Sequence, residues 1–269
     1  MNAIEFKDVC IVFGEKPARA LPLMDQGQSR EDILAASGQV LGVHDCSLTV
    51  GQGEIVVLMG LSGSGKSTLL RAVNGLNPVA RGAVIVAGAE GPVDVTKASA
   101  SEVRALRRTA VSMVFQQFGL LPWRTVAENV GLGLEISGTS KVERAERVAH
   151  QLDLVGLTER ANAPVGELSG GMQQRVGLAR ALVTEAPILL MDEPFSALDP
   201  LIRTRLQDEL LELQAKLQRT ILFVSHDLDE AFKIGNRIAI MEGGRIVQTG
   251  TPDEIRGAPA NDYVAEFLG

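Results

Sequence analysis

The residues with the clearest chemical potential form a glycine-rich stretch at 60–68, with the sequence GLSGSGKST. It follows an apolar run at 55–59 and precedes a segment in which Leu69, Val73 and Leu76 recur at helical spacing. A strand, a glycine-rich turn and a helix form the context of a phosphate-binding loop. The glycines let backbone N–H groups turn inward around an anion, and the helix N-terminus adds partial positive charge. The flanking elements favour this reading over a chance glycine-rich turn.

The side chains of this loop have distinct predicted roles. Lys66 can reach the β- and γ-phosphates of a nucleotide, and the hydroxyl of Ser67 can ligate Mg²⁺. The residues expected to bind the nucleotide here are Gly60, Ser62, Gly63, Ser64, Gly65, Lys66, Ser67 and Thr68.

Polar residues also follow three apolar strands further along the chain. They are Gln116, the pair Asp192 and Glu193, and His226. In an open α/β sheet, ligands bind beyond the carboxyl ends of such strands. Asp192 is placed to hold Mg²⁺ through its water shell, opposite Ser67. Glu193 points to a different side, where it can orient or deprotonate a water molecule that attacks the γ-phosphate. Without a phosphate loop upstream, the two acids would equally fit a helix cap or a solvated turn.

Composition limits the class of protein. The chain has 269 residues, of which 45% are hydrophobic and 22% charged, as in ordinary globular proteins. A net charge of −7 and a pI of about 5.1 argue against sequence-independent nucleic-acid binding, so we expect no nucleic-acid partner. Cys10 and Cys46 are too few for a disulfide framework or a zinc cluster, so we expect free thiols in a reducing compartment. No apolar run approaches the roughly 20 residues that cross a bilayer, so a partner would have to hold the chain at a membrane.

Several elements must position these residues. Residues 4–13 are predicted to form an edge strand, and residues 43–50 alternate like a second strand. The segment between them, 14–40, contains a short helix that Ser29 opens and Gly38 stops. This segment fits either a surface excursion or a contact with a partner. Further helices are expected at 97–108, within 125–167 and at 262–269, a hairpin at 237–248, and structural or surface roles for His44 and His150.

The order of the motifs resembles that of the ATPase subunits of ABC transporters. The phosphate loop, Gln116, LSGGMQQR at 168–175, Asp192 with Glu193, SALD at 196–199 and His226 follow in the order of this family, over nearly the whole chain. The stretch at 168–175, called the signature below, is highly specific, because other phosphate-loop ATPases lack it. Its usual fifth residue is Gln, and Met172 stands there instead.

The resemblance implies an α/β phosphate-loop NTPase fold of the ABC type. We expect a single ABC ATPase domain over 1–269, with a RecA-like core, a helical subdomain and an antiparallel β subdomain. The expected boundaries are about 1–96 and 176–250 for the core, about 97–175 for the helical subdomain, 251–269 for a C-terminal tail and 14–40 for an unusual insert.

The resemblance also implies a head-to-tail dimer that holds two ATP molecules. Each would lie between the phosphate loop of one copy and the signature of the other, where Ser169, Gly170 and Gly171 would contact it. Both motifs are glycine-led helix N-termini, so two positive helix ends would converge on one γ-phosphate. ATP would close the dimer and hydrolysis would release it, with Asp199 communicating across the interface.

Catalytic roles follow by the same resemblance. Gln116 would ligate Mg²⁺ and sense the partner, and His226 would contact the γ-phosphate and steady Glu193. Phe13 matches the aromatic residue that stacks on adenine, although an ordinary core phenylalanine fits that position equally. The predicted catalytic residues are therefore Glu193, His226 and Gln116, the predicted metal ligands Ser67, Gln116 and Asp192, and the predicted cofactors ATP and Mg²⁺.

Finer features resemble importers of glycine betaine, proline and choline. They are the insert, LGVHD at 41–45, MGLSGSG at 59–65 and FSALDPLIR at 195–203; LPWR at 121–124 is most like the choline branch. Trp123 lies where the family contacts the coupling helix of the permease, although ordinary packing would also explain it. The expected partners are the permease, a second copy and, indirectly, a substrate-binding protein, at the cytoplasmic face of the inner membrane.

Alternatives within the family remain open. A glycine betaine or proline importer is the first, and a soluble ABC ATPase outside transport is the second. The second is disfavoured, because the phosphate loop and the signature lie about a hundred residues apart with no sustained heptads between them. Osmoregulated relatives carry a tandem regulatory module after the ATPase domain. This chain stops at Gly269, so we expect either that it lacks this regulation or that the sequence is a truncated form.

Overall fold

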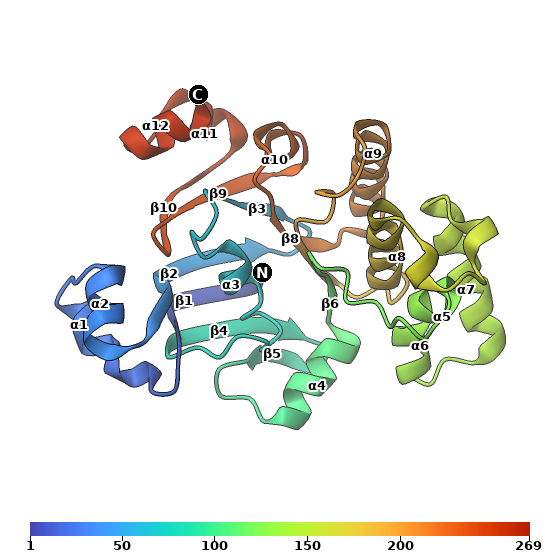
Figure 1. Cartoon of the computed structure of the whole chain (residues 1–269), viewed down its shortest axis with the longest axis horizontal. Helices are drawn as coiled ribbons and strands as arrows, with labels where there is room; N and C mark the ends of the chain where they lie inside the picture. Colours follow the sequence, from blue (N-terminus) through green and yellow to red (C-terminus); the bar gives the residue numbers. More distant parts are fainter. The chain divides into compact units, whose positions relative to one another are not determined.

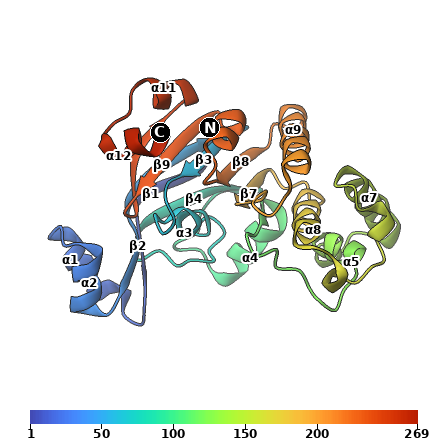
Figure 2. The same ribbon diagram turned by 45° about the horizontal axis from the view of Figure 1, so that its top comes forward.

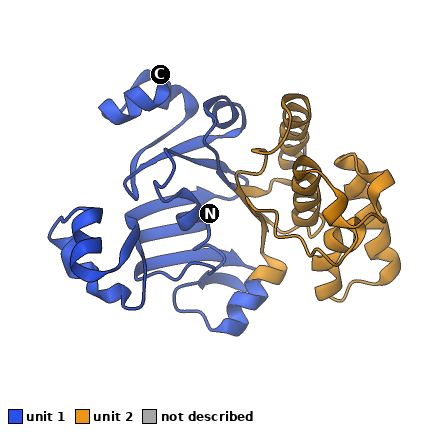
Figure 3. Ribbon diagram, viewed as in Figure 1, with its two compact units in different colours: residues 1–106, 222–269 blue, residues 107–221 orange. Residues whose placement is uncertain are grey.

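The computed structural model describes residues 1–269, except for the side chain of Leu213 (Figure 1). The chain divides into two compact units, each described by itself below. Unit 1 contains Met1–Leu106 and Leu222–Gly269, and unit 2 contains Arg107–Ile221 (Figure 3).

Strands and helices alternate along much of the chain. The strands are β1 (Asn2–Phe13), β2 (Val40–Gly51), β3 (Ile55–Met59), β4 (Arg81–Gly88), β5 (Gly91–Asp94), β6 (Val111–Val114), β7 (Ile188–Asp192), β8 (Thr220–Val224), β9 (Arg237–Glu242) and β10 (Arg245–Gly250). The α-helices are α1 (Leu21–Asp25), α2 (Arg30–Ser37), α3 (Lys66–Leu70), α4 (Ala100–Thr109), α5 (Val126–Val130), α6 (Leu132–Ile136), α7 (Lys141–Leu154), α8 (Gly170–Leu182), α9 (Pro200–Leu217), α10 (Leu228–Ile234), α11 (Pro252–Gly257) and α12 (Asp262–Leu268). Short 3₁₀ turns lie at Pro17–Arg19, Thr158–Arg160 and Val165–Glu167.

Unit 1 carries two sets of paired strands. One is a four-stranded antiparallel sheet in the order β2-β1-β4-β5. The other has the order β10-β9-β3-β8, in which β3 and β9 are parallel and β9 and β10 form the predicted hairpin. The prediction that 4–13 is an edge strand is wrong, because β1 pairs with β2 on one side and β4 on the other. The apolar pattern of a strand reports which of its faces are covered, and it does not report how many strands pair with it.

The insert, residues 14–40, packs against β1 and β2 through α1 and α2 (Figure 2). Ser29 caps α2 by accepting a hydrogen bond from the Asp32 N–H at 3.1 Å, and Gly38 ends the helix at a φ of 68°, as predicted. Apolar side chains of the insert and of the two strands form one cluster: Cys10, Val12, Ala20, Met24, Ile33 and Leu41. The insert therefore has a buried core and is not a loose surface loop.

Unit 2 carries the parallel pair β6 and β7, with Val111 beside Ile188 and Val114 beside Met191. The predicted helix after residue 169 is α8, which buries Val176, Ala179 and Leu182, among others. Helix α9 follows Asp199. The helical pattern within 125–167 resolves into α5, α6 and α7 with two short 3₁₀ turns.

The helix after the phosphate loop is shorter than its apolar spacing predicts. Helix α3 ends at Leu70, and the N–H groups of Ala72 and Val73 then bond carbonyls three residues back. Such 3₁₀-like turns keep the same rough periodicity, so the sequence pattern continues where the α-helix does not. Leu76 is 43% exposed, which separates it from the buried Leu69 and Val73.

Both cysteines are free, as predicted, and the structure shows that both are buried. Burial raises the pKa of the Cys46 thiol to about 11. None of the helices in the described part of the chain combines the length and apolar character that a bilayer crossing requires.

Candidate functional site

The phosphate loop lies in unit 1, between β3 and α3. Gly60, Gly63 and Gly65 have φ values of 140°, 79° and 102°, in the region that favours glycine. A Cβ atom on Gly60 would overlap the Met241 carbonyl, and one on Gly65 would lie 2.7 Å from the Gly42 carbonyl oxygen. Glycine is therefore required at 60 and 65 both by backbone conformation and by close approach of neighbouring strands.

Lys66 is held inside this loop and is only 6% exposed. Its Nζ donates hydrogen bonds to the carbonyl oxygens of Gly60 at 2.7 Å and Leu61 at 2.9 Å. The carbonyl dipoles compensate the ammonium charge and keep the lysine head against the loop backbone. This places a cation at the glycine turn where the sequence predicts phosphate binding.

Phe13 ends β1 beside the same loop. Phe13 is 38% exposed, whereas Phe6 of the same strand is fully buried. A Cβ atom on Gly42 would lie 2.8 Å from Cε2 of Phe13 and 3.1 Å from Cγ2 of Thr68, so the ring lies close to the start of α3. The alternative in which Phe13 is an ordinary core residue is therefore wrong.

His226 is also in unit 1, directly after β8. The N–H of Ser225 donates to the Leu58 carbonyl at 3.2 Å, which ties the end of β8 to β3. His226 is exposed. The strand that leads to the phosphate loop and the strand that leads to His226 are thus neighbours in one sheet.

Gln116, Asp192 and Glu193 lie in unit 2, where the parallel register of β6 and β7 aligns their carboxyl ends. The Nε2 of Gln116 donates a hydrogen bond to Oε2 of Glu193 at 3.2 Å. Asp192 is fully buried at the last position of β7. The structure brings these residues together as the strand pattern predicts.

Glu193 has an unusual backbone. Its φ is 49°, a left-handed conformation that costs a non-glycine residue about 1–2 kcal/mol. Two groups hold its carbonyl oxygen: Nε2 of Gln174 donates at 3.1 Å and Oγ of Ser196 at 3.0 Å. The sharp turn directs the chain away from β7 directly after Asp192, and neighbouring residues stabilise it.

The signature begins α8 in unit 2. Oγ of Ser169 accepts a hydrogen bond from the Met172 N–H at 3.4 Å, and Gly170 is exposed at the helix N-terminus. A Cβ atom on Gly171 would lie 3.1 Å from the Ala197 carbonyl oxygen, so this glycine permits close packing on the 196–199 segment.

Asp199 caps the next helix. Its Oδ1 accepts from the Ile202 N–H at 3.1 Å, and Pro200 takes the first helical position. Asp199 is also exposed, so capping α9 does not prevent it from contacting another molecule.

Three polar residues that support these loops were not identified as site residues from the sequence. Gln174, 1% exposed, also accepts a hydrogen bond from the Ala197 N–H at 2.9 Å. Arg180 donates to the carbonyl oxygens of Phe118 at 2.6 Å and Gly119 at 2.7 Å, just after Gln116. The third is Arg30 of the insert. The sequence pattern could have indicated burial of Gln174, because it lies four residues before Leu178 on the buried side of α8. It could not have indicated the roles of the two arginines, since their partners are backbone groups.

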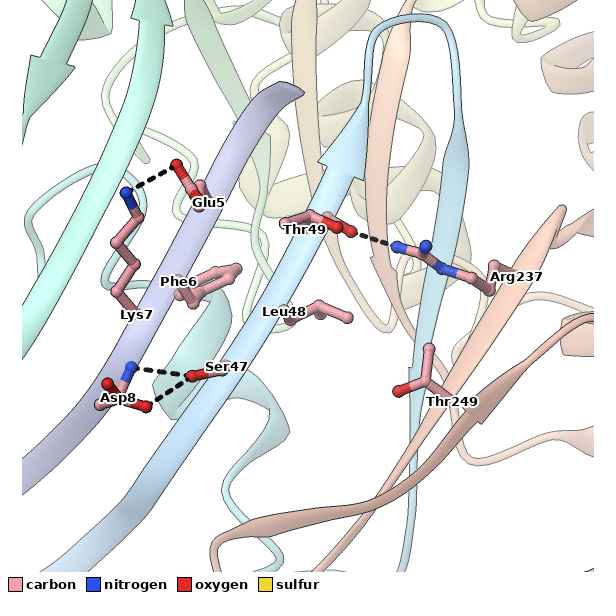
Figure 4. Close-up of a pocket in the computed structure, with 9 residues that line it drawn as sticks. All are labelled: Glu5, Phe6, Lys7, Asp8, Ser47, Leu48, Thr49, Arg237 and Thr249. Carbon is pink, nitrogen blue, oxygen red and sulfur yellow. Dashed lines mark hydrogen bonds and ion pairs between the residues drawn. The ribbon is translucent and has the colours of Figure 1, made fainter. Parts of the chain in front are cut away.

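A hollow of about 470 Å³ lies on unit 1, and no residue of the phosphate loop lines it (Figure 4). Each of its charged side chains already has a partner. Lys7 pairs with Glu5 at 3.2 Å, Asp8 bonds Ser47, and Arg237 donates to the Thr49 carbonyl. The lining does not present a preformed site for an anion. It consists of Glu5, Phe6, Lys7, Asp8, Ser47, Leu48, Thr49, Arg237 and Thr249.

Comparison with known proteins fits this arrangement. The model of the ABC transporter family matches residues 43–196. The chain is 55% identical over 265 residues to the glycine betaine/proline betaine transport system ATP-binding protein ProV of Escherichia coli, and 47% identical over 264 residues to the trimethylamine N-oxide transport system ATP-binding protein TmoW of Ruegeria pomeroyi. These matches cover 98% of this chain, 65% of the length of ProV and 76% of that of TmoW.

A solved structure agrees in fold. The ATP-binding cassette MJ0796, in a dimeric post-hydrolysis state bound to ADP and phosphate, has a TM-score of 0.80 and 29% sequence identity. The match covers 93% of this chain and 98% of that one. Family match, sequence identity and fold therefore agree that the chain belongs to the ABC transporter family and has the fold of its nucleotide-binding ATPase domain.

Proposed function

We propose that this chain binds and hydrolyses ATP to drive an ABC importer of a quaternary amine. One structural observation carries the proposal: the hydrogen bond that joins Gln116 to Glu193, the two residues expected at the metal and at the attacking water. The phosphate loop, with Lys66 folded against its carbonyls, supports it. The names of the relatives supply the substrate class.

The loop residues fit a nucleotide triphosphate. Positive-φ glycines and the start of α3 would surround the phosphates with N–H donors, and Lys66 would contact the β- and γ-phosphates. The side chains proposed for Mg²⁺ are Ser67, Gln116 and Asp192, an all-oxygen donor set of the type that Mg²⁺ prefers. When bound, this ion neutralises charge on the β- and γ-phosphates.

Hydrolysis requires activation of a water molecule. Glu193 would accept the proton as the water attacks the γ-phosphate, and Gln116 would hold the carboxylate in place. His226 would contact the γ-phosphate and steady Glu193. Phe13, exposed beside Thr68, would stack on adenine.

A second copy of the chain is the proposed partner at the nucleotide. In a head-to-tail dimer, Ser169, Gly170 and Gly171 of one copy would contact the ATP bound to the other, next to Asp199. The exposed helix start at Gly170 supports this proposal, because its N–H groups are directed outward at the first turn. The dimeric MJ0796 structure is consistent with it.

The remaining partners are permease subunits and, through them, a substrate-binding protein, with this chain peripheral at the cytoplasmic face of the inner membrane. Trp123 supports the permease contact, because its side chain is 77% exposed and so is not explained by ordinary packing. Its loop is held by hydrogen bonds: Asn129, fully buried, pairs with both backbone groups of Leu121, at 2.7 and 3.1 Å.

For the substrate, we favour glycine betaine or a related betaine, because ProV, which is 55% identical to this chain, belongs to a glycine betaine/proline betaine transport system. Choline is the second candidate, and LPWR at 121–124 is the feature that favours it.

Uptake of labelled glycine betaine and labelled choline distinguishes these readings. Cells that lack the subunit are complemented with the natural chain or with Glu193→Gln. We expect glycine betaine uptake to return only with the natural chain. Restoration of choline uptake alone would select the choline branch. If the natural chain restores uptake of neither compound, the proposal of a quaternary-amine importer is rejected. ATP hydrolysis would then be tested separately on the purified protein.

A further inference from the structure

We propose that Arg30 of the insert is a positioning residue for ATP, which holds the phosphate loop in the shape that receives the nucleotide. The inference deepens the proposed function, because it assumes that the loop binds ATP. It assigns residues 14–40 a role in the nucleotide site that neither the motifs nor the comparisons give them.

Arg30 is the first residue of α2, and its guanidinium reaches two backbone carbonyls. Nη2 donates to Gly42 at 2.7 Å, and Nη1 donates to Gly63, inside the phosphate loop, at 3.1 Å. Hydrogen bonds from a charged donor are about twice as strong as neutral ones. The fork of one arginine therefore connects the start of β2 to the middle of the phosphate loop.

The peptide between Gly63 and Ser64 is fixed from both sides. Its carbonyl accepts from Arg30, and its N–H, on Ser64, donates to the Leu61 carbonyl at 3.2 Å. In a trans peptide the two groups point in opposite directions, so fixing both sets the plane of the unit. Since Gly63 has a φ of 79° and its Cβ position is open, no side chain would otherwise restrict this plane.

The hairpin between β9 and β10 completes the support. The N–H of Gly244 donates to the Ser64 carbonyl at 3.1 Å. A Cβ atom on Gly244 would lie 2.5 Å from Nη2 of Arg30, so the guanidinium packs directly on this turn. Two consecutive carbonyls of the loop, those of Gly63 and Ser64, thus have donors on separate elements. Burial lowers the pKa of Arg30 from its usual value, as expected for a guanidinium packed among backbone groups.

The insert is anchored independently of the loop, so it can transmit a fixed position. Asp25, at the end of α1, pairs with Arg81 of β4 at 2.6 Å, and Arg81 also pairs with Asp45 at 2.9 Å. Met24 and Ile33 are buried in the apolar cluster beneath α1 and α2. Arg30 then links this anchored insert to the phosphate loop.

The test compares Arg30→Met, Arg30→Lys and the control Asp25→Asn in the full chain. Arg30→Met keeps most of the apolar stem and removes both donors. Asp25→Asn weakens the other anchor of the insert and touches no loop residue. The readouts are the Kd of a fluorescent ATP analogue with Mg²⁺, the KM and kcat of ATP hydrolysis, and the thermal midpoint without nucleotide.

We expect Arg30→Met to raise Kd and KM about tenfold, with a smaller change in kcat, since two charge-assisted hydrogen bonds are lost. Arg30→Lys, with a single compact charge, should recover part of the affinity. Asp25→Asn should lower the thermal midpoint and leave Kd unchanged. Unchanged Kd in Arg30→Met, or an equal rise in Asp25→Asn, would overturn the proposal.

If Arg30→Met does not fold, Arg30→Lys decides: a raised Kd at an unchanged thermal midpoint supports the proposal, and an unchanged Kd overturns it. Failure of the proposed function is distinguishable. In that case the natural chain itself would bind the ATP analogue no better than Lys66→Ala.

Discussion

The amide nitrogen of Gln116 lies 3.2 Å from a carboxylate oxygen of Glu193, to which it donates a hydrogen bond. The two residues are 77 positions apart in the chain, and the parallel register of β6 and β7 brings them together. A residue proposed to ligate Mg²⁺ therefore contacts the proposed general base directly. Displacement of the Gln116 side chain would remove a hydrogen-bond donor that orients the Glu193 carboxylate. The orientation of Glu193 therefore depends on the position of Gln116.

Glu193→Gln should abolish ATP hydrolysis and preserve ATP binding. The change keeps the size of the side chain and removes its basicity, which contributes about 10²–10⁴-fold to the rate in general-base catalysis. We expect a dimer on size-exclusion chromatography with ATP, because the nucleotide is retained. Glu90→Gln, in the exposed turn between β4 and β5, is the matched control and should hydrolyse ATP normally. A Glu193→Gln chain that stays monomeric with ATP would argue against the head-to-tail dimer.

Two alanine substitutions in the phosphate loop should differ in their effect on stability. Gly60→Ala places Cβ against the Met241 carbonyl, so β9 or the loop must move. Gly63→Ala meets no atom within 4 Å and incurs only the left-handed backbone penalty, about 1–2 kcal/mol. Urea unfolding without nucleotide should show a greater loss of unfolding free energy for Gly60→Ala. Equal losses would mean that close approach to β9 does not constrain the loop.

Trp123→Ala should leave ATP hydrolysis by the isolated chain unchanged and reduce transport. Trp123 is 77% exposed, so its truncation creates no cavity in the described structure. The comparison is Leu217→Ala, which truncates another exposed apolar side chain, at the end of α9. Vesicle uptake with the intact transporter measures the difference. Full transport by Trp123→Ala would remove this residue from the proposed permease contact.

We expect His44 to lower the free energy of unfolding as the pH decreases below neutral. Burial and, next, the nearby Arg245 lower the pKa of His44 from its usual value. The folded chain therefore binds fewer protons than the unfolded chain. The contribution of neutral His44 to the free energy of unfolding is fully present above the unfolded pKa of about 6.5. It is lost as the pH falls from there toward the folded pKa, and the free energy of unfolding then decreases by at most about 1.4 kcal/mol per pH unit.

Urea midpoints from pH 7.5 to pH 5 should show this slope in the natural chain and a shallower one in His44→Gln. His150 is exposed on α7, so His150→Gln should keep the natural slope. An identical slope in His44→Gln would assign the pH dependence to other groups.

Local signals in the sequence were sufficient for much of the fold. The helix at Ser29 was predictable because a helix cap acts within three residues of itself. Ser169 and Asp199 cap α8 and α9 in the same local way, although the sequence reading did not identify them as caps. The strand order was not accessible in this way. Whether β1 is central or at an edge depends on β4, whose partner residues lie about 70–80 positions further along the chain.

The support of the site was harder to predict than its motifs. Lys66, Asp192 and Glu193 belong to recognisable spacings. Arg180 and Arg30 bond backbone carbonyls 62 and 33 residues away, and any residue supplies a carbonyl. Such contacts become visible only when the backbone path is known.

The division of the chain also bears on how the protein is made. Unit 2 is one continuous stretch, whereas unit 1 needs residues 222–269 to be complete. During synthesis, at about 5–20 residues per second, all of unit 2 can therefore leave the ribosome before β9 is made. Until then β3 has no parallel neighbour on that side. The phosphate loop is made early, but the Gly244 N–H that it contacts is made about 180 residues later. The phosphate loop therefore gains its contact with the β9–β10 turn only after residue 244 has been translated.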